Sequence, residues 1–148
     1  MALVRTHDGV LRSTAWLMLV TDVGFIVYWL LIVARALPPE LMFDDYEIPS
    51  VAAWNWSFLP LDVAISVTGL LALRALRRGR ASARVLLPVS LALTSASGGM
   101  ALAFWAIAGD FDIAWWAPNA YLLAFPIPLL IRLARRPEVL APPTAHGA

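Results

Sequence analysis

The chain has 148 residues, of which 61% are hydrophobic and only 14% are charged. A soluble domain of this length needs more charged residues to cover its surface, so the composition indicates a membrane protein. The absence of cysteine excludes disulfides, thiolate metal sites and thiol oxidoreductases. The net charge is +1, but all eleven basic residues are arginine, and they are distributed unevenly.

Four apolar stretches are long enough to cross the hydrocarbon core of a bilayer, which takes about 20 residues. Each is predicted to be a helix, because lipid offers no partners for backbone groups and the stretches lack the alternation of barrel strands. The predicted spans are residues 14–36, 57–77, 84–108 and 113–134. The chain is therefore predicted to be a single all-α transmembrane domain over residues 1–148, folded as a four-helix antiparallel bundle with short connections.

The arginines predict the orientation of this bundle. They gather in the N-terminal tail, in the connection around residues 77–84 and after the fourth span, whereas the first and third connections are acidic. The positive-inside rule therefore predicts that both termini lie in the cytoplasm. Arginine without lysine, together with much alanine, suggests a bacterial source, so the expected location is multi-pass in a bacterial plasma membrane.

Two connecting segments carry expectations of their own. The first connection, from Pro38 to Trp56, is rich in aromatic residues and is expected to fold back over the outer face of the bundle. The tail from about residue 137 is rich in proline and alanine and is expected to be mobile. The prolines between residues 118 and 128 are expected to bend the fourth span.

Two carboxylic acids lie inside predicted spans, Asp22 in the first and Asp62 in the second. A carboxylate there costs about 2.5–3.5 kcal/mol on insertion scales, so something must compensate it. Both are candidate catalytic acids or cation-binding groups. The alternatives are a structural Asp62 that is hydrogen-bonded to Asn119 or a serine, and an Asp22 that locks two helices together. With straight helices, Asp22 lies deeper than Asp62 by about two turns, or ~10 Å.

The tryptophans are distributed asymmetrically, with six of seven in the predicted outer half. Because an interfacial belt occupies both membrane surfaces, this excess predicts an aromatic pocket with Asp62 and Asn119 at its base. Aromatic walls suit a cation, a sterol-like ring system or an isoprenoid. The predicted ligand-binding residues are Trp29, Trp54, Trp56, Phe58, Ser66, Thr94, Trp105, Trp115, Trp116 and Asn119.

Other polar features of the spans have simpler interpretations. Ser90, Thr94 and Ser97 follow one another at helical spacing and precede two glycines, which is typical of close helix packing in membranes. His7 and His146 lie in the tails, so no metal site is predicted. No cofactor is predicted, and nothing in the sequence supports nucleic-acid binding.

Several motifs together resemble a known family. They are the runs Thr21-Asp22-Val23-Gly24-Phe25, Trp54-Asn55-Trp56-Ser57-Phe58 with Pro60 and Asp62, Phe104 to Asp112, and Trp115-Trp116-Ala117-Pro118-Asn119. These motifs are similar to those of the YvaD-like family of small bacterial four-helix membrane proteins of unknown function. The resemblance covers most of residues 15–133. It implies the topology above and no activity.

A second similarity is to the EXPERA group, which includes the emopamil-binding sterol isomerases. The matching pieces are Leu37-Pro38 with Glu40-Leu41, Trp54-x-x-Ser57-Phe58-x-x-x-Asp62, and Pro118 with Tyr121-Leu122-Leu123. In that group an acid at the Asp62 position lines a cavity that opens to the membrane and contacts a cationic amine or a carbocation-like intermediate. The isomerase histidine has no counterpart in the spans here, so the resemblance implies binding rather than sterol isomerisation.

These observations favour a membrane protein that binds a hydrophobic or cationic small molecule, such as a lipid, a sterol-like compound or an isoprenoid. Three alternatives stay open. A carboxylic acid that an apolar cavity keeps protonated could start an isoprenoid isomerase or cyclase reaction. An exporter of cationic compounds could exchange a proton at Asp22 or Asp62, for which four short helices would need a homodimer. A structural or assembly partner would use the polar residues to join helices.

Overall fold

A computed structural model describes residues 9–37, 47–136 and 140. Within these residues the regular structure is entirely helical. The helices are α1 (Gly9–Val33), α2 (Pro49–Ser57), α3 (Leu59–Arg77), α4 (Ala83–Ala108), α5 (Ile113–Ala124) and α6 (Ile127–Arg135). The predicted mobile tail from residue 137 lies outside the described residues apart from Leu140, as does the part of the first connection before Glu47.

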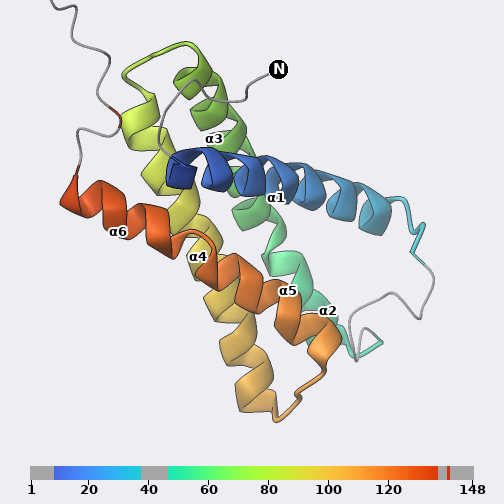
Figure 1. The fold of residues 1–148 in the computed structure, drawn as a ribbon. Helices are drawn as coiled ribbons and strands as arrows, with labels where there is room; N and C mark the ends of the chain where they lie inside the picture. The colour runs from blue at the N-terminus through green and yellow to red at the C-terminus, as the bar shows by residue number, and fades with distance from the viewer. Residues whose placement is uncertain (1–8, 38–46, 137–139, 141–148) are drawn as a thin grey trace, which may run out of the picture.

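Two pairs of helices follow each other almost without interruption, α2 into α3 and α5 into α6. The described chain therefore has four helices long and apolar enough to cross a membrane, and these are Gly9–Val33, Pro49–Arg77, Ala83–Ala108 and Ile113–Arg135. The predicted all-α, four-helix antiparallel membrane bundle is confirmed. Figure 1 shows α3 and α4 side by side, α5 packed on α4, and α1 crossing α3.

Three helices end in the same kind of turn, in which one residue takes a left-handed conformation. That residue is Gly79 after α3 (φ 61°) and Gly109 after α4 (φ 77°). After α1 it is Arg35 (φ 51°), and the N–H of Ala36 donates to the carbonyl oxygen of Leu31 at 3.0 Å. The turn at Arg35 explains why α1 ends at Val33, three residues before the predicted end of the first span.

The second span begins at Pro49, eight residues before its predicted start at residue 57. Proline suits the first turn of a helix, where its missing N–H needs no partner, so Pro49 starts α2 and Pro60 lies in the first turn of α3. Phe58 joins the two helices with φ −77°, close to a helical value. The predicted outer connection is therefore shorter than expected, because its last part is helix α2.

The fourth span, which its prolines were expected to bend, is divided into two helices at Pro126, whereas Pro118 lies inside α5. Pro126 has no N–H, so the helical hydrogen-bond pattern is interrupted there, although Phe125 (φ −63°, ψ −29°) keeps helical backbone angles. Helix α5 therefore ends at Ala124, and α6 begins at Ile127. Asp112 fixes the start of α5, because its Oδ1 accepts a hydrogen bond from the N–H of Ala114 at 3.1 Å.

The two ends of the bundle are packed differently. At the arginine-rich end, apolar side chains from four helices form a core, whose buried members are Leu11, Ala15, Met18, Ala72, Leu73, Leu87, Leu91 and Leu129. At the other end, Trp29, Ile32, Phe58 and Ala101 form a smaller cluster. Val23 and Val27 on the outside of α1 are exposed. The aromatic end therefore has the smaller buried cluster, and a cavity lies beside it.

The α4–α5 pair makes an unusually close approach at Gly98. A Cβ atom at Gly98 would lie 2.5 Å from the backbone oxygen of Asn119 and 2.6 Å from the backbone nitrogen of Leu123. A Cβ at the neighbouring Gly99 would make an ordinary contact of 3.5 Å with Leu123. Helices in lipid associate through such close packing, so Gly98 sets the distance between α4 and α5.

We predict that Gly98→Ala lowers the free energy of unfolding by about 1–3 kcal/mol, the usual cost of overpacking a core. The added methyl group meets backbone atoms, which cannot rotate away. The measurement is unfolding of the purified protein in increasing fractions of a denaturing detergent, followed by circular dichroism. Gly99→Ala is the matched control and should be neutral. Equal stability of the two variants would contradict the prediction.

Candidate functional site

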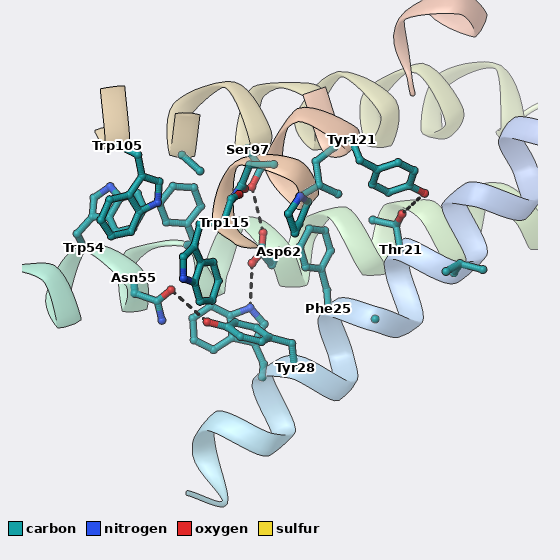
Figure 2. Close-up of a pocket in the computed structure, with 18 residues that line it drawn as sticks. Thr21, Phe25, Tyr28, Trp54, Asn55, Asp62, Ser97, Trp105, Trp115 and Tyr121 are labelled. Atoms are coloured by element: carbon teal, nitrogen blue, oxygen red, sulfur yellow. Dashed lines mark hydrogen bonds between the residues drawn. The ribbon is translucent and has the colours of Figure 1, made fainter. Parts of the chain in front are cut away.

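Asp62 lies in the first turn of α3, and its carboxyl group is buried between three helices (Figure 2). The residue is only 5% exposed. Its Oδ2 accepts a hydrogen bond from Nε1 of Trp29 on α1 at 2.9 Å, and its Oδ1 accepts one from Oγ of Ser97 on α4 at 3.3 Å. The predicted serine partner is thus Ser97. The predicted alternative, Asn119, donates instead to the carbonyl oxygen of Trp115 at 2.8 Å.

A cavity of about 370 Å³ opens beside Asp62, between the aromatic ends of the helices. Its walls come from five helices, α1 to α5, and α2 closes it with Trp54 and Asn55. The lining residues are Val20, Thr21, Gly24, Phe25, Tyr28, Trp29, Trp54, Asn55, Phe58, Asp62, Ser97, Ala101, Trp105, Trp115, Pro118, Asn119, Tyr121 and Leu122. This volume is within the range of small-molecule sites in proteins.

Ring contacts hold the aromatic wall of the cavity in place. The ring of Trp54 stacks on Phe104 with centroids 3.8 Å apart and meets Trp105 edge to face at 5.4 Å. On the opposite wall, the ring of Tyr28 meets Trp29 edge to face at 5.2 Å. The hydroxyl of Tyr28 donates to Oδ1 of Asn55 at 3.2 Å, which ties α1 to α2 (Figure 2). These contacts connect α1 to α2 and α2 to α4 around the cavity.

The polar groups of the cavity are few and unequally satisfied. Asp62 is the one acidic residue among the described residues that line it, and no arginine or histidine is among them. Thr21 Oγ1 and the Tyr121 hydroxyl share a hydrogen bond of 3.1 Å. The side-chain nitrogen of Asn55 is buried and has no hydrogen-bond partner. The described lining of the cavity thus contains one acid and a buried side-chain nitrogen, that of Asn55, without a hydrogen-bond partner.

Asp22 does not share this cavity. It is 1% exposed, and its carboxyl group packs against Gly69 of α3, while Ser66 Oγ donates to the backbone oxygen of Asp22 at 3.1 Å. The Asp22–Gly69 contact and the Trp29–Asp62 contact are separated by seven residues on each helix, about two turns or ~10 Å. The two acids thus lie at different depths, with Asp22 nearer the arginine-rich end.

Seven of the residues predicted for the site line the cavity together. They are Asp62, Trp29, Trp54, Phe58, Trp105, Trp115 and Asn119. Five others lie elsewhere, because neighbouring positions on a helix point to different sides.

Those five make separate contacts. Trp56 packs on the ring of Trp29 at 5.4 Å, and Trp116 donates to the backbone oxygen of Asp110 at 2.9 Å. Thr94 donates within its own helix, at 2.9 Å to the oxygen of Ser90, while Ser66 and Asp22 contact each other. The structure therefore separates these residues from the cavity.

The comparisons with known proteins show a family. A model described as "Family of unknown function (DUF5360)" matches residues 14–138. The chain is also 47% identical over 121 residues to "Uncharacterized protein YvaD" of Bacillus subtilis (strain 168), a match that covers 80% of this chain and 91% of the relative. The chain belongs to the DUF5360 family. No solved structure matches it.

Membership of the DUF5360 family confirms the predicted YvaD-like resemblance and, like that resemblance, implies no activity. The similarity to the emopamil-binding group is not shown by these comparisons and stays a prediction. For this DUF5360 protein, the functional argument therefore depends on the geometry of the cavity.

Sequence reasoning missed several lining residues of this DUF5360 member. Thr21, Phe25 and Tyr28 follow one another on α1 at spacings of four and three, which is one face of a helix. That spacing could have indicated that these residues share one wall of the site. Gly24 lies on the same face. Ser97 was interpreted as a packing residue, and nothing in its spacing shows that it bonds to Asp62.

We predict that substitutions of Gly69 and Asp22 have strongly non-additive effects on the free energy of unfolding. A Cβ atom at Gly69 would lie 2.7 Å from Cγ of Asp22, so Gly69→Ala should cost about 1–3 kcal/mol of stability. The same change in an Asp22→Ala background should cost much less, because the obstructing carboxyl group is gone. Detergent unfolding of the two single variants and the double variant measures the coupling. Additive effects would show that the two residues do not meet.

Proposed function

We propose that the cavity binds a hydrophobic molecule that carries one cationic group, within a protein that spans a bacterial plasma membrane. The cation would lie beside Asp62, and the hydrophobic part would lie against the aromatic walls. One observation carries the proposal. A buried acid opens on an aromatic cavity to which the described residues contribute no basic side chain.

The electrostatics of Asp62 favour a positive guest. Trp29 and Ser97 donate hydrogen bonds to its oxygens but bring no charge. A carboxylate has about four acceptor sites, so two donors leave room for others. Opposite unit charges 4 Å apart attract by about 4 kcal/mol at the effective dielectric of a protein near its surface. A cationic group on the guest would thus compensate the buried charge.

The walls suit the rest of such a molecule. Tyr28, Trp29, Trp54, Trp105 and Trp115 line the cavity and present large apolar surfaces. A cation near such rings gains about 0.5–2 kcal/mol from the ring quadrupole, more when water is excluded. The unpartnered side-chain nitrogen of Asn55 also favours a guest that has a hydroxyl or carbonyl oxygen near its cationic group.

Binding is better supported than the alternative activities. In an acid-initiated reaction Asp62 would give its proton to the guest, but both of its oxygens accept hydrogen bonds from the protein. An exporter could exchange its proton at Asp22 or Asp62, but Asp22 is buried against Gly69 and outside the cavity lining, which leaves Asp62 alone for that role.

We predict that Asp62→Asn weakens binding of an amphiphilic amine by about thirtyfold or more, because truncating a buried charge pair commonly costs at least about 2 kcal/mol. The probe is a twelve-carbon alkyl amine with a photoreactive diazirine, compared with the alcohol of equal length. Saturable labelling of cavity peptides, measured by mass spectrometry in phosphatidylcholine nanodiscs, gives the apparent affinity.

Asp22→Asn is the matched control, since it neutralises a buried acid outside the cavity, and it should leave amine labelling unchanged. Labelling by the alcohol should be equal in all three proteins. Equal amine affinity in wild type and Asp62→Asn would overturn the proposed function.

The route into the cavity supports a guest dissolved in the bilayer. Val20 and Gly24 on α1 and Tyr121 on α5 line the cavity and are also exposed. A Cβ atom at Gly24 would meet nothing within 4 Å. These exposed lining residues favour a mouth of the cavity between α1 and α5. The Thr21–Tyr121 hydrogen bond joins the two helices beside this mouth.

We predict that Gly24→Leu slows labelling by the amine probe without lowering protein stability, because the new side chain enters an open space at the mouth of the cavity. The readout is the rate of labelling after rapid mixing with probe-loaded vesicles. Val23→Leu enlarges a neighbouring lipid-facing residue outside the cavity lining and should have no effect. Equal rates for both variants would show that the guest enters elsewhere.

A further inference from the structure

A second hollow lies at the arginine-rich end of the bundle, on the α1–α3 side. Its volume is about 460 Å³. Leu19 of α1 and leucines of α3 form its apolar part, and Arg74, Arg77 and Arg78 form its basic part. The hollow shares no lining residue with the aromatic cavity.

The three arginines converge on one side of the end of α3. Arg77 and Arg78 follow Arg74 by three and four residues, a spacing that brings side chains together on a helix. All three are exposed, and no acidic residue pairs with them in the part of the chain that the structure describes. Basic residues suit the negative end of a helix dipole, which explains their sign. It does not explain three mutually repelling charges beside an apolar hollow.

The leucines extend the hollow toward the middle of the membrane. Leu70 precedes Arg74 by one turn, which is about 6 Å along the helix axis. Leu71 is 48% exposed, and Leu19 faces the hollow from α1. A guest that fits this hollow has an anionic group at the level of the arginines and a hydrocarbon chain that runs inward from it.

We infer that this hollow binds an anionic phospholipid, with its phosphate held by Arg74, Arg77 and Arg78 and an acyl chain along the leucines of α1 and α3. Guanidinium groups donate paired hydrogen bonds to phosphate oxygens. Basic pockets between membrane helices are known to hold anionic headgroups. A zwitterionic lipid also has a phosphate, but its own amine offsets the charge that the arginines attract. The inference is independent of the guest proposed for the aromatic cavity.

The test is native mass spectrometry of delipidated protein titrated with dioleoyl phosphatidylglycerol or dioleoyl phosphatidylcholine. Phosphatidylglycerol should bind more tightly to wild type. The triple variant Arg74→Gln/Arg77→Gln/Arg78→Gln should bind it about a hundredfold less tightly, since each arginine near a membrane surface contributes about fivefold. Arg80→Gln/Arg135→Gln/Arg136→Gln is the matched control, because it removes the same charge from residues outside the hollow and should bind as wild type does.

Equal losses in the two triple variants would overturn the inference, because the effect would then be one of overall charge. Displacement of the lipid by millimolar inorganic phosphate would also overturn it, because the hollow would then bind phosphate without an acyl chain. If the first triple variant does not fold, Arg74→Gln alone should weaken phosphatidylglycerol binding about fivefold. No change in that variant would count against the site.

Discussion

The structure depends on one buried carboxyl group and the cost of placing it in an apolar membrane protein. Asp62 meets that cost by accepting hydrogen bonds from Trp29 and Ser97, so a single side chain joins α1, α3 and α4. The same two bonds leave the acid at the edge of a cavity with room for another donor. Stability and the proposed binding function thus use the same group. A helix shift large enough to break either bond would expose an unpaired polar atom to lipid.

The leucine core and the proposed binding site lie at opposite ends of the bundle. The arginine-rich end has the larger leucine-rich core, with a hollow on its α1–α3 side, and the aromatic end has the cavity beside Asp62. Helix α4 contributes to both, with Leu87 and Leu91 in the core and Ser97 and Trp105 in the cavity wall. Close packing at Gly98 joins the two parts, because Asn119 of the cavity lies against it. The packed leucine core can therefore hold the helices that form the cavity walls at fixed distances.

The spans could be predicted because length and hydropathy decide what crosses a bilayer, and Gly79 and Gly109 mark the ends of α3 and α4. The end of α1 could not be predicted, since Arg35 takes a left-handed conformation that arginine rarely adopts. Within the site, tryptophans and an acid in an apolar run were visible in the sequence. The Ser97 partner of Asp62 was not, because periodicity gives the face of a residue on its own helix and says nothing of what the next helix brings opposite it.

The bond between Trp29 and Asp62 also bears on how the protein is made. The ribosome delivers α1 before α3, so a donor for Asp62 has already been synthesised when the second span enters the membrane. The acid can then be transferred together with its first partner, and Ser97 arrives later with α4. The first two spans would therefore enter the bilayer as a hairpin. The order of the helices along the chain thus contributes to the burial of Asp62 in the membrane.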